Sequence, residues 1–362
     1  MVSCDALSMD RLLNPMSYLT ISSFWPAVGI AVVCGLLCSA VLGFLLKSGL
    51  AWRLATDVPN ERSLHVRPTP RVGGWGMVPM SVLAIAFVAH SLWLVAAVAV
   101  FLAAVSQIDD RRGLPARVRF VAHLVGVLAL IIVYPAPVPV WGLAIIAFLM
   151  LWLVNLYNFM DGSDGLAGGM ALFGFGGYTV AALAGPHPLT ELGYACAAIA
   201  GAAAGFLVFN FHPARIFLGD AGSIPAGFLA GALGYWGWRG GAWPIWFPAM
   251  VFLPFIADAT VTLLRRLARG EKFWQAHREH YYQRMVCLGF GHARTSVIWY
   301  AVMLVGVVIA VFALGFAESL QWLLVASWVA VLAVIGSAVD IRWRNFQSML
   351  TRQTEVDPDA SK

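Results

Sequence analysis

At the centre of the chain the sequence reads Asn155-Leu-Tyr-Asn158-Phe-Met-Asp161-Gly-Ser-Asp164-Gly165-Leu-Ala-Gly168-Gly169, between two apolar runs. Residues three apart advance about 60° around an α-helix, so one unbroken helix cannot direct all four polar side chains at one ligand. The pattern therefore predicts that Asn155 and Asn158 end a membrane helix. Residues 161–169 would form a tight loop whose glycines let the backbone approach a ligand closely. A solvated acidic turn between two helices is the alternative interpretation.

The composition predicts an all-α polytopic membrane protein. Of the 362 residues, 60% are hydrophobic and 11% are charged, with a mean hydropathy of +0.80, which excludes a soluble globular domain. Eleven apolar stretches approach the roughly 20 residues that cross a bilayer. The predicted spans are 25–46, 74–90, 91–108, 118–134, 138–154, 166–184, 190–209, 222–236, 244–264, 295–316 and 321–339. The second and eighth are the shortest, so ten spans is the alternative count.

The basic residues predict the orientation of these spans. Only Arg11 and Arg239 of the 23 Lys and Arg residues fall on one side, and the other 21 fall in the opposite set of loops and the C-terminal tail. Because cytoplasmic loops are rich in Lys and Arg, the N-terminus is expected outside and the C-terminus inside. The formal net charge of +5 then lies mainly on the cytoplasmic face, where it suits anionic lipid heads and phosphates. Nucleic acid is not an expected partner.

The domain organisation is expected to be simple, because no repeat or second domain is visible. A short N-terminal segment (1–23) would precede one transmembrane domain (24–340), which includes a cytoplasmic loop at 265–294, and a cytoplasmic tail (341–362) would follow. The five cysteines show no metal or disulfide spacing and are interpreted as packing residues.

Two polar clusters lie in the first predicted cytoplasmic loops. Residues 57–74 are rich in proline and carry Arg67 and Arg71, whose planar guanidinium groups suit phosphate oxygens. A plain basic loop is the alternative. Asp109 and Asp110 are adjacent at the end of the third span, where they repel each other and oppose the helix dipole. This arrangement is poor for stability and favours a functional role, although the arginines that follow could relieve the repulsion.

Two further clusters follow the central stretch. Asp220 stands beside Gly219 just before a predicted helix, which suits either a hard-cation ligand near a diphosphate or a helix N-cap. In the longest loop, His280 follows Arg278 by two residues. All five clusters fall on the predicted cytoplasmic side, which predicts one active site at that membrane interface.

Together these motifs resemble the polyprenyl-phosphate N-acetylhexosamine-1-phosphate transferase superfamily, glycosyltransferase family 4. The resemblance covers about residues 25–340. Its motifs are the Asp109-Asp110 pair, the Asn-x-x-Asn-x-x-Asp-Gly-x-Asp-Gly run, Asn210 ten residues before Asp220, and the final Arg-x-His. It implies an enzyme of the bacterial inner membrane with ten or eleven helices. Such enzymes transfer a sugar 1-phosphate from a UDP-HexNAc to undecaprenyl phosphate and release UMP, with Mg²⁺, or alternatively Mn²⁺, as cofactor.

The resemblance also implies roles for individual residues. Asp220 would be the metal ligand, and Asp109 or Asp110 would be the catalytic base or would orient the acceptor phosphate. The implied substrate-binding residues are Asn155, Asn158, Asp161, Asp164 and Asn210 around the nucleotide, Arg278 and His280 at the sugar or diphosphate, and Arg71. Direct attack and a covalent enzyme intermediate both stay open, as do a monomer and a homodimer.

The last loop narrows the resemblance to one branch. Where the peptidoglycan-precursor branch has three consecutive histidines, this sequence reads His280-Tyr-Tyr-Gln283. This form is most similar to enzymes that initiate O-antigen chains, and it points to no single sugar. The alternatives are initiating enzymes for peptidoglycan precursors, teichoic acid or enterobacterial antigen. A lipid or solute transporter is the competing class, but transporter sites lie near the bilayer midplane rather than in loops on one face.

Asp258 requires a separate explanation because it lies inside the ninth predicted span. It precedes Arg265 by seven residues and so lies about 10 Å below the basic boundary. A lipid-facing carboxylate at this depth would cost a few kcal/mol, so Asp258 needs a partner. One interpretation is a structural hydrogen bond to a Thr or Trp on a neighbouring helix. The other is that Asp258 supports Asp220 or the adjacent aspartates from behind the catalytic cavity.

Overall fold

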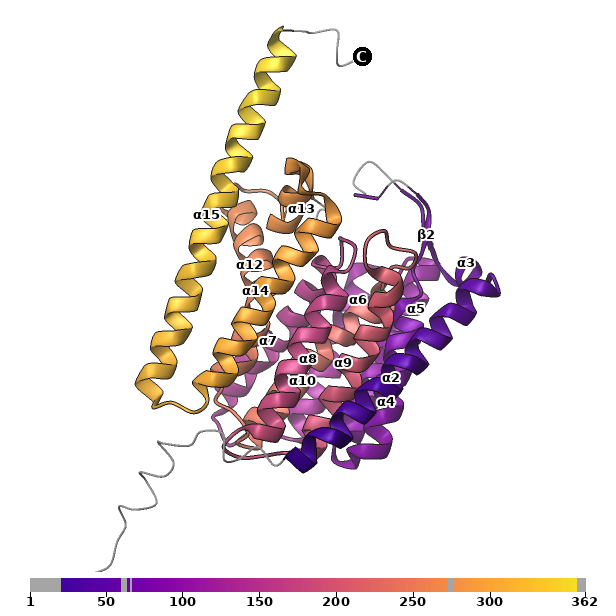
Figure 1. Cartoon of the computed structure of the whole chain (residues 1–362), viewed down its shortest axis with the longest axis vertical. Helices are drawn as coiled ribbons and strands as arrows, with labels where there is room; N and C mark the ends of the chain where they lie inside the picture. Colours follow the sequence, from indigo (N-terminus) through magenta and orange to yellow (C-terminus); the bar gives the residue numbers. More distant parts are fainter. Residues whose placement is uncertain (1–20, 60–63, 66, 273–276, 357–362) are drawn as a thin grey trace, which may run out of the picture.

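The computed structural model describes residues 21–59, 64–65, 67–272 and 277–356, which form an almost wholly helical bundle (Figure 1). Nearly all of the predicted N-terminal segment, the end of the predicted tail, and parts of the 57–74 and 265–294 loops lie outside the described residues. The helices and helical turns are α2 (Ile21–Lys47), α3 (Leu50–Leu54), α4 (Gly73–Val88), η1 (His90–Leu92), α5 (Trp93–Arg112), α6 (Ala116–Val133), α7 (Val140–Phe159), α8 (Leu166–Ala184), α9 (Thr190–Asn210), α10 (Asp220–Arg239), α11 (Trp246–Val251), α12 (Leu253–Ala268), α13 (Tyr281–Met285), η2 (Val286–Phe290), α14 (Gly291–Ala313) and α15 (Glu318–Val356).

The prediction of a polytopic helical membrane protein is confirmed. Within the described residues, eight helical segments are long and apolar enough to cross a membrane. They are Ser22–Lys47, His90–Arg112, Ala116–Val133, Val140–Phe159, Leu166–Ala184, Thr190–Asn210, Tyr281–Ala313 and Glu318–Met349. The other predicted spans coincide with the short apolar α4, with α10, and with the pair α11 and α12. The count of eleven therefore stays a prediction.

The ninth predicted span, 244–264, is not one continuous helix. It is divided into α11 and α12, which meet at Phe252. Pro254 stands at the start of α12 and has no backbone N–H, so it cannot donate the hydrogen bond that would continue α11. Beyond this break, α12 carries Asp258 and Arg265, which contact Tyr281 of α13.

Glycines bring the helices around the central stretch into close contact. A Cβ atom on Gly201 of α9 would lie 2.0 Å from the carbonyl oxygen of Ala31 in α2. A Cβ atom on Gly74 of α4 would lie 2.6 Å from the backbone of Ala221 in α10. Small residues at such contacts are typical of packed membrane helices. The second contact holds the start of α10 against the first loop.

The helices α12 to α15 form a group on one side of the bundle, where α15 extends beyond the others (Figure 1). Little of the apolar part of α15 is buried, and the helix packs mainly against α13, α14 and η2, with polar contacts to Trp246 of α11 and Arg265 of α12. The helix continues without a break through residue 340, where the sequence predicts the end of the membrane domain.

Candidate active site

Loops from several parts of the chain surround a polar cavity of about 250 Å³, which we call the carboxylate cavity. Six of the eleven predicted site residues line it: Arg71, Asn158, Asp161, Asp164, Asn210 and Asp220. Residues 57–74, 155–169 and 210–223 are therefore brought together, as their shared side of the membrane predicts. Asp57, His65, Ser163 and His292 also line the cavity, and sequence reasoning did not assign them to it.

Backbone pairing fixes the wall that carries Arg71. The short strands β1 (Thr56–Asp57) and β2 (Thr69–Pro70) are antiparallel, and Arg71 continues into a bridge with Phe217. The guanidinium group of Arg71 is 2.7 Å from Asp57 and 4.0 Å from Asp110. Because the Arg71 side chain is 38% exposed, it can still bind an oxygen of a phosphate substrate.

Asp220 is the first residue of α10 and faces the cavity opposite the central loop. Gly219 precedes it with φ of +73°, a conformation that favours glycine and turns the chain sharply into the helix. The Asp220 carboxylate is 3.8 Å from Arg119 and accepts a hydrogen bond from the Asn158 amide. The Ser223 hydroxyl donates to Asn158 at 2.9 Å, which fixes the direction of that amide.

The Asp161 carboxylate lies in the loop beside Asp220. Burial and the neighbouring charge of Asp220 raise the pKa of Asp161 to about 7. Arg71 and the backbone N–H of Gly219 lower this pKa, but they do not offset the increase. The cavity therefore holds more negative charge than its own cations compensate.

The two adjacent aspartates have different surroundings. Both oxygens of Asp109 are occupied, because the Leu114 N–H donates to Oδ1 at 2.6 Å and Arg119 donates to Oδ2 at 2.9 Å. The side chain of Asp110 is 4% exposed, and within the described part of the chain its Oδ2 atom has no hydrogen-bond partner. Neither residue lines the carboxylate cavity directly, but Asp110 adjoins it through Arg71.

Asp164 and Asn210 hold two loops together at the cavity wall. His212 Nδ1 is 2.7 Å from Asp164 Oδ2, which also accepts the Ala214 N–H at 3.1 Å. Asn210 accepts the Gly165 N–H at 3.0 Å and donates to a backbone carbonyl at 2.9 Å. These two residues thus fix the loops of the cavity wall, and their contact with substrate stays a prediction.

His292 was missed by sequence reasoning. Its Nδ1 is 2.9 Å from the Ser163 hydroxyl, and its ring stacks on His212 at 5.6 Å. The available signal was a histidine just ahead of the apolar run of α14, on the predicted side of the other clusters.

Three predicted substrate-binding residues lie away from the cavity lining. The amide of Asn155 donates to Leu151 O at 2.7 Å within its own helix. His280 is buried and its Nδ1 is 3.1 Å from Asp258. Arg278 is partly buried and does not appear in the lining formed by the described residues.

Asp258 has structural partners, as one sequence interpretation predicted, but its Thr donor belongs to its own helix and most of the other donors belong to α13. Besides His280, it accepts the backbone N–H groups of Tyr281 and Tyr282 at 2.9 and 3.1 Å and the hydroxyl of Thr262 at 3.3 Å. Among the described residues, Asp258 is bonded to these donors and not to Asp220, which one interpretation expected it to support. Asp258 fixes the start of α13.

The donor set of the cavity fits a magnesium ion that is shared with a phosphate substrate. No three His, Cys, Asp or Glu residues in the described ranges are grouped as a complete metal site. However, Mg²⁺ usually takes one or two protein carboxylates and completes its octahedron with water and phosphate oxygens. Asp161 and Asp220 supply such a pair, and the uncompensated charge around Asp161 favours a cation there.

Comparisons with known proteins agree with this site. Residues 92–237 match the model of the family described as glycosyl transferase family 4. Over 301 residues the chain is 30% identical to the decaprenyl-phosphate N-acetylglucosaminephosphotransferase of Mycobacterium leprae, covering 69% of this chain and 75% of the relative. It is 26% identical over 324 residues to the probable undecaprenyl-phosphate N-acetylglucosaminyl 1-phosphate transferase of Bacillus subtilis, covering 82% and 89%. It is 27% identical over 264 residues to the phospho-N-acetylmuramoyl-pentapeptide-transferase of Syntrophus aciditrophicus, covering 61% and 72%.

These similarities extend over most of the chain and of each of these relatives, and the matched family segment contains Asp109, Asp110, the central stretch and Asp220. The chain therefore belongs to glycosyl transferase family 4 and is a multi-pass membrane phosphoglycosyl transferase of the polyprenyl-phosphate N-acetylhexosamine-1-phosphate transferase superfamily.

Proposed function

We propose that this enzyme transfers a HexNAc 1-phosphate from a UDP-sugar to undecaprenyl phosphate and releases UMP, with Mg²⁺ held by Asp220 and Asp161. The observation that carries this proposal is the excess negative charge of the carboxylate cavity beside an available Arg71. A diphosphate and a divalent cation together would fill and neutralise such a site. The names of the relatives support a polyprenyl-phosphate acceptor.

The residues of the chain have distinct tasks in this proposal. Arg71 binds phosphate oxygens, and Asn158 orients Asp220. Asp110 orients the acceptor phosphate or takes its proton, because its free Oδ2 is the unsatisfied oxygen of the pair. Asp109 instead holds Arg119 beside Asp220. Bound in the cavity, the cation would offset the charge of the diphosphate and of the leaving UMP.

The proposed location is the cytoplasmic side of a bacterial inner membrane. The distribution of 21 basic residues against two supports this orientation. The donor is soluble and the acceptor is a lipid, so the site must open both to the cytoplasm and to the bilayer. A transporter is disfavoured because the polar cavity is built from loops and helix ends rather than from broken helices at mid-depth.

The proposed pathway class is initiation of O-antigen or a related surface polysaccharide. The support is the His280-Tyr281-Tyr282-Gln283 form of the last loop. Tyr282 is buried and contacts Gly162 at the cavity, so this departure from a histidine lies close to the site. UDP-N-acetylglucosamine is the first donor to test, since several relatives are named for N-acetylglucosamine.

The test is release of UMP by the purified protein. Undecaprenyl phosphate would be incubated with UDP-GlcNAc, UDP-GalNAc, UDP-N-acetylquinovosamine, UDP-N-acetylfucosamine or UDP-MurNAc-pentapeptide, with Mg²⁺ or with EDTA. We expect UMP and a lipid-linked sugar diphosphate from at least one amino-sugar donor, and no product without lipid or metal. The proposal would be contradicted if none of the donors released UMP, or if UMP were released without the lipid. Product from the pentapeptide donor alone would move the enzyme to the peptidoglycan branch.

A further inference from the structure

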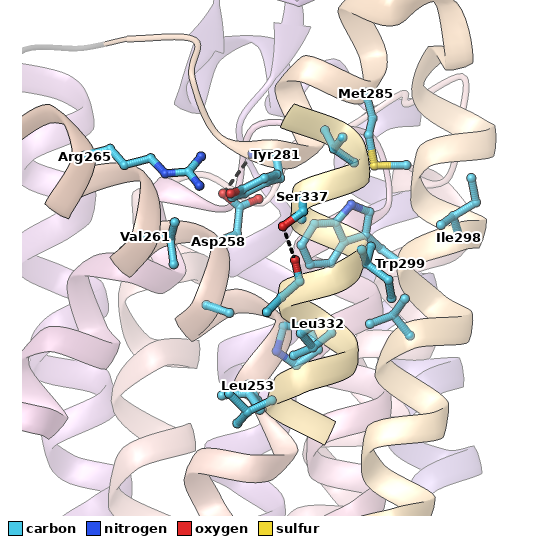
Figure 2. Close-up of a pocket in the computed structure, with 18 residues that line it drawn as sticks. Leu253, Asp258, Val261, Arg265, Tyr281, Met285, Ile298, Trp299, Leu332 and Ser337 are labelled. Atoms are coloured by element: carbon cyan, nitrogen blue, oxygen red, sulfur yellow. Dashed lines mark hydrogen bonds between the residues drawn. The ribbon is translucent and has the colours of Figure 1, made fainter. Parts of the chain in front are cut away.

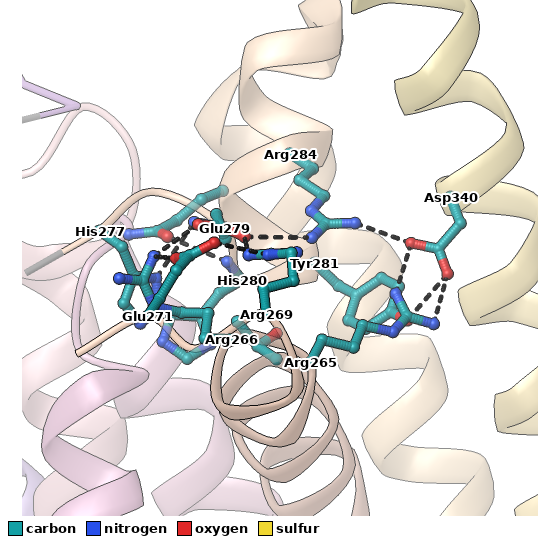
Figure 3. Close-up of polar contacts among 12 residues, drawn as sticks. Arg265, Arg266, Arg269, Glu271, His277, Glu279, His280, Tyr281, Arg284 and Asp340 are labelled. Carbon is teal, nitrogen blue, oxygen red and sulfur yellow. Dashed lines mark hydrogen bonds and ion pairs between the residues drawn. The ribbon is translucent and has the colours of Figure 1, made fainter. Parts of the chain in front are cut away.

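Asp340 of α15 is the centre of a set of ion pairs where α12, α13 and α15 meet (Figure 3). Its carboxylate accepts hydrogen bonds from Arg265 of α12 at 2.8 Å and from Arg284 of α13 at 2.7 Å. The hydroxyl of Tyr281, also in α13, donates to it at 3.1 Å. The side chain of Asp340 is 14% exposed, so these contacts are partly shielded from water.

These polar contacts matter more because the apolar packing below them is incomplete. A cavity of about 330 Å³ separates α12, α14 and α15, with apolar residues such as Leu253 and Leu332 in its lining (Figure 2). Arg265 and Tyr281 lie at its polar end (Figure 2). At this cavity α15 does not pack directly against α12. The ion pairs of Asp340 join α15 to α12 and α13 at the polar end of the cavity.

The short helix α13 connects this cluster to the carboxylate cavity. Tyr282 is 1% exposed, and its hydroxyl donates to Phe159 O at 3.2 Å at the end of α7. A Cβ atom on Gly162 would lie 2.2 Å from the same hydroxyl oxygen. Since Gly162 stands between Asp161 and Ser163 in the cavity wall, a shift of α13 would move the loop that carries Asp161.

We propose that Asp340 is a positioning residue for phosphoglycosyl transfer, which fixes α13 and, through Tyr282, the loop at 161–164. A helix of five residues does not hold its own position, so it depends on such contacts. Asp258 fixes the first backbone N–H groups of α13, and Asp340 fixes its side chains from the opposite helix. The inference rests on the proposed function only in taking the carboxylate cavity as the site of transfer.

The test compares Asp340→Asn, Asp340→Glu and, as a matched control, Arg344→Gln at an exposed position four residues further along α15. Amide hydrogen exchange of the protein in lipid nanodiscs would be followed in peptides that cover residues 156–165 and 281–285. We expect faster exchange in both peptides for Asp340→Asn, with α8 and α9 unchanged. Asp340→Glu should restore most of the protection, and the control should match the wild type.

Kinetics supply the second readout. For Asp340→Asn we expect kcat to fall about tenfold, within the cost of misplaced reacting groups, while KM for the donor changes less than about threefold. If Asp340→Asn does not purify in a folded form, Arg284→Lys replaces it, because it keeps the charge but loses the planar contact. Unchanged exchange at 156–165 in the folded variant overturns the proposal. Since exchange needs no substrate, this result stands even if the wild type proves to use another donor.

Discussion

Two charged regions of the molecule, the ion-pair cluster of α12 to α15 and the carboxylate cavity, differ in how their negative charges are compensated. In the cluster, Glu279 pairs with Arg266 and Arg269. Burial alone would raise the pKa of Glu279, but the hydrogen bonds from Arg269 and Arg266 hold it below the usual range. Asp340 is likewise held by two arginines and a tyrosine (Figure 3).

In the cavity the compensation is incomplete. The pKa of Asp161 is raised to about 7, and no partner for the Oδ2 atom of Asp110 is found among the described residues. Carboxylates that outnumber the cations beside them, as Asp57, Asp161, Asp164 and Asp220 do around Arg71, mark a place where a cationic ligand is expected. The comparison teaches that carboxylates paired with arginines hold this fold together, whereas carboxylates with too few cations mark the proposed site of transfer.

The largest expected effect comes from removing a charge from the cavity. Asp220→Asn should lower Mg²⁺-dependent turnover by about a hundredfold, because a carboxylate of a hard-cation site is lost. Thermal stability should be unchanged or slightly higher, since less like charge remains in the cavity. Steady-state UMP release over a range of Mg²⁺ concentrations measures this effect. Turnover near the wild-type rate at low Mg²⁺ would sink the metal assignment.

The next comparison uses the adjacent aspartates, whose sequence context is almost the same. Asp110→Asn should reduce kcat by about ten- to a hundredfold with little change in melting temperature, because its free oxygen serves the reaction. Asp109→Asn should mainly lower the melting temperature, since the amide keeps only one acceptor oxygen and cannot accept from both Leu114 and Arg119. Thermal unfolding and kinetics of both variants decide the matter. A larger loss of kcat for Asp109→Asn would reverse the assignment.

Contact between the two regions can be broken and then restored. In Gly162→Ala the new methyl group would lie 2.2 Å from the Tyr282 hydroxyl, so we expect a loss of about 1–3 kcal/mol of stability and lower turnover. Adding Tyr282→Phe removes that oxygen and leaves the ring carbon as the nearest atom, at 3.2 Å. The double variant should therefore recover part of both losses. Additive losses in the double variant would argue against this contact.

The smallest effect is expected where charges are well satisfied and partly exposed. Glu279→Gln should cost at most about 1 kcal/mol, because its partner Arg269 is exposed and Arg266 keeps Glu271 as a second partner. The pKa of Glu279 is lowered on folding, so its contribution is present above its ordinary value of 4.5 and is lost as the pH falls through the folded pKa. The melting temperature of Glu279→Gln should thus fall less than that of the wild type between pH 6 and pH 3. Parallel curves would show that Glu279 contributes nothing.

Local sequence was sufficient to predict the long helices and six of the residues that line the carboxylate cavity. Apolar runs locate the long helices, whereas the short α3 and α13 have no such signal, and Pro254 could have revealed the break in the ninth span. The six lining residues belong to loops and helix ends on one side of the bundle, so their convergence was predictable: Arg71, Asn158, Asp161, Asp164, Asn210 and Asp220.

The remaining assignments depend on contacts between distant residues. The difference between Asp109 and Asp110 arises only when the chain turns back and brings Leu114 and Arg119 to one of them. The buried position of His280 requires a loop that returns to Asp258, 22 residues earlier in the chain. Neither hydrophobic periodicity nor charge pattern contains this information.

The most direct test of the central claim is binding of Mn²⁺, as a substitute for Mg²⁺, measured by electron paramagnetic resonance on protein with UMP in lipid nanodiscs. The wild type and Glu279→Gln should each bind one Mn²⁺ ion at the site with equal affinity. Asp220→Asn should bind it at least about tenfold more weakly, the typical cost of disturbing a metal site. Equal Mn²⁺ affinity in the wild type and Asp220→Asn would contradict the claim that the unsatisfied carboxylates form the metal site.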